Sequence, residues 1–508
     1  MLYRLGPRIT RFLRRYRAPV CSVDEQPWRH PYLDHENLRR FRRYSEAVWD
    51  FALAYKPRED RPLLCAFTVN MAQTMYKWAR LAQKYGVDAT LFPHPRDGSA
   101  ISAPEWEDYD GEFSDVLDGE AFRRQFTPGA LDVPCRRVRM DGGALWKSWQ
   151  SFNVGDRRPL LRLLAQAPTV RHETLFSYRG LYPYYEWASA LADYDVIYAA
   201  GNALPAYFSG RPYCSFSPGG DLIYDCGRAD DFGAAMAVAV NGARFLTVTN
   251  PHPLAHCRRL GLTNALYLPY AMDDERYSPG RGHTRAEWEA QYGRGVFVLS
   301  SARIDAKVKG QDDRLLGALV EAARACPDLR FVFLAWGESA NEFRDQIATT
   351  GLGNRFVVLA PVGKKRLIDY YRSADIVLDQ MVFGYYGATA LEAAAVGKPI
   401  IMKLRTEHYA PLSGGDVAPI MNVGRPEDVT EALIRLARSS SLRQEQGVEL
   451  RHWLVRTHGE RRCVPLMLAL LRLTADRVPL PPDLPSPLVD PESEAERAYH
   501  AACLRPVR

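Results

Sequence analysis

Hydrophobic runs of five or six residues alternate with longer amphipathic stretches in the first half of the chain. An apolar run at 63–68 is followed by a helical pattern that ends near Lys84, and a second run occupies 87–92. Short buried strands separated by helices of this length are typical of a parallel sheet. The pattern weakens between 94 and 180, which indicates loops and insertions. Regular strands return further along, at 196–199, 212–216, 245–248 and 266–269.

A second series of the same kind begins at Val296. Its expected strands lie at 296–300, 331–335, 356–359, 376–378 and 399–402. Helices are expected near 312–326, 338–350, 364–373 and 388–396, and helical periodicity resumes at 427–438 and 441–475. Each series is long enough for its own doubly wound sheet. The sequence therefore predicts an α/β protein whose two Rossmann-like domains face a cleft.

The chain of 508 residues divides on this pattern into five parts. They are a basic amphipathic arm at 1–55, a first Rossmann-like domain at 56–285, a second at 286–455, a C-terminal helix at 456–475 and a proline-rich tail at 476–508. A return of the C-terminal helix to the first domain is one option. The proline spacing of the tail favours a stiff, extended segment.

The arm carries almost all of the net charge. Residues 1–45 hold 11 arginines and 4 acidic residues, while the whole chain carries +6. Within 1–17, apolar residues and arginines recur at spacings of three and four on two faces, which predicts an amphipathic helix. Such a helix can lie on an anionic membrane surface. Packing on the protein itself, disorder and an organelle transit peptide remain open.

Composition disfavours several classes of protein. No window approaches the ~20 apolar residues of a membrane-spanning helix, and no secretory signal is visible. The 9 cysteines are scattered without a C-x-x-C pair, which disfavours a zinc site or a disulfide framework and suits a reducing cytosol. The body outside the arm is close to neutral, so no nucleic-acid partner is expected. We expect a cytoplasmic protein, with peripheral binding to the inner face of the membrane as an option.

The stretch 382–401 is the most informative part of the sequence. It reads as a glycine-rich loop, a short alanine-rich helix, a Gly-Lys-Pro stop and a new apolar strand. The first N–H groups of a helix are unpaired and its dipole is positive there, so the loop is a candidate phosphate site. Glu392 lies one turn into the helix, where a carboxylate suits sugar hydroxyls, and the combination suggests a nucleotide sugar. An ordinary βαβ turn with tightly packed glycines is the alternative.

Two cations follow the first strand of the second domain. Arg303 and Lys309 lie at the carboxyl end of that strand, beside the expected cleft. Positive side chains there can neutralise a diphosphate and stabilise a nucleoside diphosphate as it leaves. A solvated loop with surface charges is the alternative. Asp312 and Asp313 are adjacent and diverge on a helix, so no metal-chelating pair is expected.

Taken together, these segments resemble the donor half of retaining two-domain glycosyltransferases with the GT-B fold. The family is the family-four type, also called glycosyl transferases group 1. The resemblance covers 195–440 well and the first domain loosely. It is carried by Arg303 with Lys309 and Gly310, by Leu378, Asp379 and Gln380, by 384–399 and by the interdomain segment 266–279.

The resemblance implies a role for each matching position. Arg303 and Lys309 would hold the donor diphosphate, and Glu392 would hydrogen-bond the nucleotide ribose. The backbone around Gly387, Ala388 and Thr389 would meet the phosphates or the donor sugar. Pro361 and Val362 would lie beside the base.

One position departs from the family pattern. Relatives commonly carry a second glutamate eight positions before Glu392, near the donor sugar, and here that position is Gly384. Asp379 and Gln380 precede the loop and are implied to fill part of its role. The departure leaves open the identity of the donor sugar and the retention of catalysis.

The first domain is expected to bind the acceptor. Asp221 follows two glycines after the strand at 212–216, so its carboxylate is the leading candidate for an acceptor-side polar group. A plain turn residue is the alternative. Further candidates are Gly201, Asn202, His252 and the turn 70–73, where relatives often carry two glycines.

The function that follows is transfer of a sugar from a nucleoside diphosphate sugar to a hydroxyl acceptor, with retention implied by the resemblance. Arg303, Lys309 and the helix start at 387–389 would position the donor and stabilise the leaving group, without a metal or other cofactor. The arm suggests a lipid-linked glycan as acceptor, as in surface polysaccharide or glycolipid assembly. Alternatives are a nucleotide-sugar-binding scaffold that has lost catalysis and a sugar-nucleotide epimerase.

Overall fold

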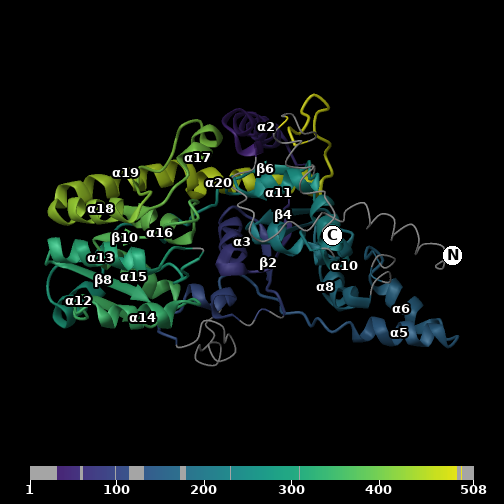
Figure 1. Cartoon of the computed structure of the whole chain (residues 1–508). Coiled ribbons are helices and arrows are strands. Elements are labelled where there is room, and N and C mark those ends of the chain that lie inside the picture. The colour runs from purple at the N-terminus through teal and green to yellow at the C-terminus, as the bar shows by residue number, and fades with distance from the viewer. Residues whose placement is uncertain are drawn as a thin grey trace.

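Two parallel sheets form the two lobes of the molecule in the computed structural model (Figure 1). The predicted membrane-binding helix at 1–17 and, apart from Glu494, the tail beyond 488 lie outside the residues that the structure describes. No helix within the described part of the chain is long and apolar enough to cross a bilayer. The described residues are 31–57, 61–95, 97, 99–113, 131–171, 175, 179–228, 230–307, 309–488 and 494.

The first sheet has six parallel strands in the order β2-β1-β3-β4-β5-β6. Every residue of β3 and β4 is buried, as expected for central strands covered on both faces. The strand order reverses between β1 and β3, so a ligand is expected at their carboxyl ends. The strands are β1 (Leu64–Thr68), β2 (Asp88–Phe92), β3 (Val196–Ala200), β4 (Tyr213–Ser217), β5 (Leu246–Val248) and β6 (Ala265–Tyr267).

The second sheet has the order β12-β11-β10-β7-β8-β9, again parallel, with its reversal between β7 and β10. Phe297 and Leu299 of β7 enter one hydrophobic core and Val298 enters another, because successive side chains point to opposite faces. Both sheets are therefore doubly wound, which confirms the predicted fold class. The strands are β7 (Val296–Ser300), β8 (Leu329–Leu334), β9 (Phe356–Leu359), β10 (Ile376–Leu378), β11 (Ile400–Met402) and β12 (Met421–Asn422).

Helices on both faces of each sheet begin and end at residues suited to those positions. Asp312 caps its helix by accepting a 3.0 Å hydrogen bond from the Leu315 N–H, and Gly397 ends another with a φ of +75°. The first lobe contains α3 (Thr74–Lys84), α8 (Tyr185–Ala190), α9 (Leu204–Ser209), α10 (Asp231–Asn241) and α11 (Pro253–Leu260). The second contains α12 (Thr284–Tyr292), α13 (Asp313–Ala325), α14 (Ala340–Thr349), α15 (Lys364–Ser373), α16 (Ala388–Val396), α17 (Thr406–Ser413) and α18 (Pro426–Arg438).

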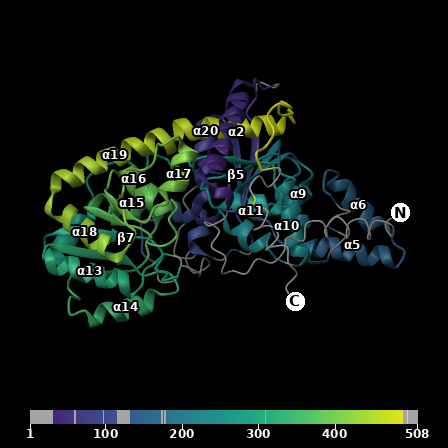
Figure 2. The same ribbon diagram turned by 45° about the horizontal axis from the view of Figure 1, so that its top comes forward.

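Two consecutive helices, α19 (Ser440–His458) and α20 (Glu460–Ala475), run from the second lobe to the first (Figure 2). The sequence predicted one helix here, but Gly459 is extended and a Cβ on it would collide with the Val455 carbonyl. The segment between the lobes satisfies both helix ends at this break. Met272 N–H donates to the His458 carbonyl at 2.8 Å, and Asp274 accepts from the Glu460 N–H at 2.8 Å. Beyond the break, α20 packs on β3, β4 and α2 of the first lobe.

Two further regions differ from the sequence prediction. Residues 35–54 form α2 (His35–Ala54), whose Leu38 and Phe41 are fully buried, so this part of the expected arm belongs to the body of the first lobe. The region expected to contain loops holds two helices, α5 (Gly143–Asn153) and α6 (Arg158–Gln166). Both follow glycine- or proline-containing turns that obscure the helical period.

Candidate functional site

The reversal of the second sheet brings the predicted phosphate-binding residues together. Arg303 follows β7, remains 44% exposed at its side chain and pairs with Asp305 at 3.0 Å. Lys309 comes from the same loop and reaches the start of α16, because a Cβ on Gly387 would lie 3.9 Å from its Nζ. A cation and the positive end of a helix therefore face the same place, which is suited to an anion. Ala388 and Thr389 form the first turn of that helix.

The glycine loop before α16 is held by Asp379 and Gln380. The Asp379 carboxyl is buried and accepts from the Ala390 N–H; burial raises its pKa, and Lys309 opposes this rise. The Gln380 amide donates to the Lys403 carbonyl at 3.0 Å and accepts from the Gly384 N–H at 2.9 Å. These contacts hold the glycine loop in place at the start of α16.

Gly384 could not be replaced by the glutamate of relatives without a change in this loop. Its φ is +83°, a conformation that side chains other than glycine rarely adopt. A Cβ there would also collide with the Arg405 side chain. The backbone conformation at Gly384 therefore disfavours the glutamate of the family pattern, and the Arg405 side chain lies beside this position.

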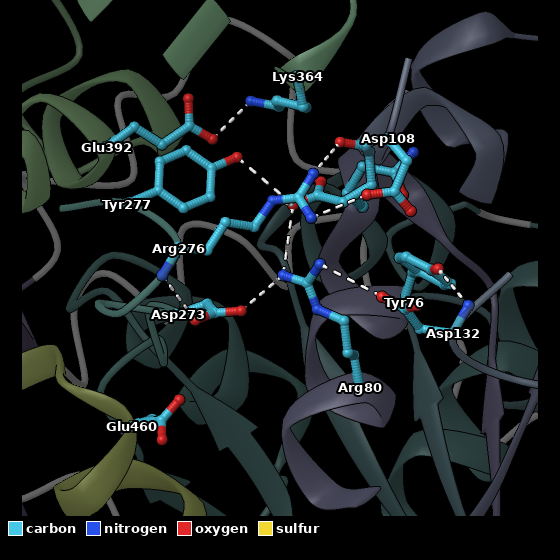
Figure 3. A network of polar contacts seen from close by, with 12 residues as sticks. Tyr76, Arg80, Asp108, Asp132, Asp273, Arg276, Tyr277, Lys364, Glu392 and Glu460 are labelled. Carbon is cyan, nitrogen blue, oxygen red and sulfur yellow. Dashed lines mark hydrogen bonds and ion pairs between the residues drawn. The ribbon is translucent and has the colours of Figure 1, made fainter. Parts of the chain in front are cut away.

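Glu392 is engaged inside the protein. Its side chain is 1% exposed, and one oxygen accepts from Lys364 Nζ at 2.5 Å (Figure 3). The other oxygen accepts from the Tyr371 hydroxyl at 3.1 Å. Tyr371 also contacts Ser301 at 2.7 Å, and Ser301 lies 3.4 Å from the Thr389 hydroxyl. A ribose that bound Glu392 would have to replace the Lys364 ammonium.

Residues 100–113 of the first lobe, which we call the strap, lie across the second lobe where the resemblance places the nucleotide base. The Trp106 indole donates to the Val362 carbonyl at 3.0 Å, and its ring lies 4.8 Å from Lys364 Nζ. Phe113 N–H donates to the Pro361 carbonyl at 2.9 Å. The strap therefore covers the predicted base-binding backbone and contacts the partner of Glu392.

A partly buried ionic network ties the strap to α3 and to the interdomain segment. Arg276 of the interdomain segment pairs with Asp108 at 2.8 Å, and Arg80 of α3 pairs with Asp273 at 2.7 Å (Figure 3). Arg80 also lies 3.7 Å from Glu107, which is fully buried. These residues join α3, the strap and the interdomain segment at the mouth of the cleft.

The loop between β1 and α3 reaches the same cleft under backbone strain. Val69, Ala72 and Gln73 have φ values of +65°, +45° and +66°, at the turn where relatives often carry two glycines. Such conformations cost about 1–3 kcal/mol each and persist only where surroundings hold them. Here the strap holds them, because Gln73 donates to the Ala103 carbonyl at 2.6 Å and Asn70 to the Ser102 carbonyl at 3.0 Å.

Asp221 starts a π-helical turn (Asp221–Asp225) directly after β4. One carboxylate oxygen accepts from the Ser217 hydroxyl at 2.7 Å, and the other has no hydrogen-bond partner among the described residues. Burial raises the pKa of this carboxyl to about 7. A buried carboxyl that titrates near neutrality and keeps one free oxygen is suited to exchange a hydrogen bond with a hydroxyl ligand.

His252 links Asp221's loop to the glycine loop of the other lobe. Its ring packs on Phe383 at 4.8 Å and on Tyr385 at 4.6 Å, while a Cβ on Gly219 would collide with its Nε2. Burial and then His408 lower its pKa to about 3, so the imidazole is neutral. Candidate acceptor and donor loops thus meet at this histidine.

One candidate from the sequence has a structural role, and two lysines near the site were not predicted from the sequence. The Asn202 side-chain oxygen, just before α9, accepts from the Leu204 N–H at 3.1 Å. Lys364 and the buried Lys77, whose Nζ lies 5.1 Å from the Tyr270 ring, were missed because each sits within an ordinary amphipathic helix. Over the described ranges, no three His, Cys, Asp or Glu side chains cluster closely enough to hold a metal ion.

Comparison with known sequences finds a family that the second lobe resembles. Residues 295–439 match the family of Glycosyl transferases group 1. Mannosylfructose-phosphate synthase of Agrobacterium fabrum is 28% identical over 157 residues, which are 29% of this chain and 34% of that protein. The chain thus matches about a third of the length of this relative.

Solved structures match over most of both chains. HepE of Anabaena in complex with UDP and glucose has a TM-score of 0.54 at 12% identity, covering 80% of this chain and 98% of that one. Sucrose-phosphate synthase of Thermosynechococcus elongatus has 0.52 at 14%, covering 81% and 98%. A glycosyltransferase of Rickettsia africae has 0.53 at 11%, covering 83% and 100%. The chain therefore has the GT-B fold, and its residues 295–439 match the family of glycosyl transferases group 1.

Proposed function

We propose that the chain is a glycosyltransferase that moves a sugar from a nucleoside diphosphate sugar to a hydroxyl acceptor, with retention at the anomeric carbon. The observation that carries this proposal is the placement of Lys309 at the start of α16, at the reversal of the second sheet. Arg303 stands in the same loop with a half-exposed guanidinium. This arrangement suits a diphosphate, and the group 1 family match supports its use in glycosyl transfer.

The residues support a mechanism based on positioning and charge. The bond between the anomeric carbon and the diphosphate oxygen breaks, and the acceptor oxygen bonds to that carbon on the same face. Arg303, Lys309 and the N–H groups at 387–389 stabilise the charge that develops on the diphosphate. A phosphate oxygen of the donor takes the acceptor proton. No metal or other cofactor is needed in this scheme, since cations and a helix dipole carry the charge.

The first lobe supplies the acceptor side. Asp221 offers a buried carboxyl with one free oxygen, and the neutral His252 stands between it and the glycine loop. A hydroxyl held between these groups would face the donor sugar. Structural neighbours crystallised with UDP, with UDP and glucose and with UDP-glucose support a uridine donor. A lipid-linked glycan acceptor and peripheral attachment to the inner face of a membrane are proposed from the basic arm at 1–17.

A nucleotide-sugar-binding scaffold is the second candidate, and two observations favour it. Gly384 stands where relatives carry a glutamate, and its φ of +83° disfavours that residue. Glu392 is occupied by Lys364 rather than open to the cleft. Loss of turnover with retention of nucleotide binding is the behaviour expected of such a protein.

Release of nucleoside diphosphate from UDP-, GDP- and ADP-sugars separates these functions. We expect release from one donor, reduced roughly 10²–10³-fold in Arg303→Ala and Lys309→Ala, which remove charge opposite the leaving group. Lys307→Ala, in the same loop, is the matched control and should retain activity. Nucleotide binding without release, even with membrane lipid extract as acceptor source, would establish the scaffold. Absence of any nucleotide binding would refute the assignment of the donor site.

A further inference from the structure

The α5–α6 hairpin extends away from both sheets at the outer end of the first lobe (Figures 1 and 2). Its chain is inserted between β2 and β3. Each helix buries one face against its surroundings, with Leu145 on α5 and with Leu160 and Leu163 on α6. The inner faces explain why the hairpin folds, whereas Val154 in its turn and Leu161 on α6 stay exposed in the part of the chain that the structure describes.

The turn and outer face carry exposed apolar side chains. Val154, in the turn, is 85% exposed, which is the largest value among the exposed large hydrophobic residues of the described chain. Leu161, on the outer face of α6, is 60% exposed. Trp149 and Phe152 stack on each other just before the turn, with ring centroids 5.6 Å apart. These side chains give the projecting turn a small apolar tip.

Basic side chains surround this apolar tip. Residues 143–166 contain four cations, Lys147, Arg157, Arg158 and Arg162, and one acid, Asp156. Arg158 pairs with Asp156 at 3.0 Å, and Arg157 lies over the Phe152 ring at 5.9 Å. The hairpin therefore presents an excess of positive charge around a small apolar tip.

We infer that the α5–α6 hairpin is a contact element for an anionic lipid surface. An apolar tip inserts between headgroups while flanking cations meet lipid phosphates, which is the arrangement of interfacial membrane elements. A protein partner fits less well, because a convex tip with two exposed apolar residues offers far less than the about 800 Å² per side of a stable protein interface. A membrane needs no complementary shape.

This inference goes beyond the proposed function and does not depend on it. The hairpin belongs to the first lobe, which also carries Asp221, so membrane contact would hold that lobe against the lipid surface. The hairpin is a different segment from the predicted membrane-binding arm at 1–17, which lies outside the described residues. Two membrane signals together bind more stably than either alone.

Co-sedimentation of the full chain with vesicles tests the inference. We expect binding to vesicles of phosphatidylglycerol and phosphatidylcholine in equal parts, and much weaker binding to phosphatidylcholine alone. The double variant Val154→Asp/Leu161→Asp should lower the partition coefficient at least tenfold. Arg157→Ser/Arg162→Ser should lower it roughly fivefold per arginine, since each basic residue near such a surface contributes about 1 kcal/mol. Val448→Asp, on α19, is the exposed apolar control and should bind like the wild type.

Two outcomes would overturn the inference. Failure of the wild type to bind anionic vesicles would exclude the contact, and equal binding by the wild type and both hairpin variants would assign it to another segment. Hydrogen exchange gives a second readout that does not rely on variants: vesicles should protect residues 150–162 in the wild type. Neither measurement depends on donor turnover, so both would still test membrane binding if the protein had no glycosyltransferase activity.

Discussion

Burial changes the chemistry of single residues in the cleft more than their sequence context does. Among the described residues, no opposite charge opposes the burial of Asp221, so burial dominates and raises its pKa to about 7. His252 is buried equally, and its pKa falls to about 3. The two groups affect stability in opposite senses. A folded protein that holds a proton on Asp221 loses stability as pH rises, while one that keeps His252 neutral loses stability as pH falls.

Asp221→Asn should remove one component of the pH dependence of stability. Between about pH 4 and about pH 7 the folded protein retains the Asp221 proton that the unfolded chain releases, so wild-type stability declines across this window. The melting temperature of the variant, relative to wild type, should therefore rise from the lower to the upper end of the window. Asp193→Asn, at an exposed aspartate, is the control. Parallel profiles for all three proteins would contradict the assignment.

The Glu392–Lys364 pair should reveal itself in unfolding by urea. Lys364→Met leaves a buried carboxylate with only the Tyr371 hydroxyl, and breaking such a pair costs about 3–5 kcal/mol of unfolding free energy. Glu392→Gln/Lys364→Met removes the unpaired charge and should recover most of the loss. Lys365→Met, at the neighbouring lysine with a 62% exposed side chain, should change stability by less than about 0.5 kcal/mol. A single variant as stable as wild type would show that the pair contributes little.

At the scale of elements, the spacing of hydrophobic residues predicted the strands well but did not predict where one helix ends and the next begins. The predicted strands at 296–300, 356–359 and 376–378 match β7, β9 and β10, because buried parallel strands are continuous apolar runs bounded by polar turns. The break between α19 and α20 was missed, since Gly459 interrupts no hydrophobic spacing. Contacts made by the distant segment 272–274 cause that break.

Gly459→Ala tests whether the break is required. The added methyl group would collide with the Val455 carbonyl, so the helix junction must shift, at a cost of about 1–3 kcal/mol. Gly317→Ala is the matched control, because a Cβ there, in the middle of α13, meets nothing within 4 Å. That variant should be stabilised by about 0.5–1 kcal/mol. Thermal unfolding of both proteins measures the contrast, and equal effects would refute it.

Removal of the Trp106 side chain should loosen the strap. Trp106→Ala loses the hydrogen bond to the Val362 carbonyl and the contact with Lys364, so the strap no longer covers that backbone. We expect faster amide hydrogen exchange at 362–366 in the variant. Trp149→Ala, in the α5–α6 hairpin, should leave exchange at these amides unchanged. Equal protection in wild type and Trp106→Ala would mean that the strap does not cover the site in solution.

At the scale of the whole molecule, an ionic network links α3 and the strap of the first lobe to the interdomain segment. Arg80 pairs with Asp273 and lies near Glu107, with all three side chains at most 8% exposed. Such a network is well suited to fix one relative orientation, because each carboxylate left without its partner would be buried and costly.

Loss of Arg80 should uncouple the lobes in calorimetry. Arg80→Met removes the cation that two buried carboxylates, Asp273 and Glu107, share, so we expect the heat absorption to broaden or split into two transitions. Arg61→Met removes an ion pair with Asp195 that lies within the first lobe and is the control. It should leave the number of transitions unchanged. A variant of Arg80 that unfolds in the wild-type manner would show that the other contacts between the lobes, including those of α19 and α20, are enough to couple them.

The sequence by itself determined the two doubly wound domains and the donor-side loops. Apolar runs and turn residues are local signals, and Arg303, Lys309 and Gly387 follow strands whose carboxyl ends must share one edge of a sheet. The tertiary structure alone decided which of these groups remain available. Whether Glu392 faces a ligand or Lys364 depends on how α15 packs on α16, as seen in their direct hydrogen bond.

The acceptor side depended on tertiary structure even more. The pKa of Asp221 follows from burial, which sequence spacing does not report. The strap crosses from one lobe to the other, and its partners at 361–364 lie some 250 positions away along the chain. Contacts over such separations arise only when both sheets are folded and docked, because hydrophobic period and turn chemistry describe neighbours along the chain and not neighbours in space.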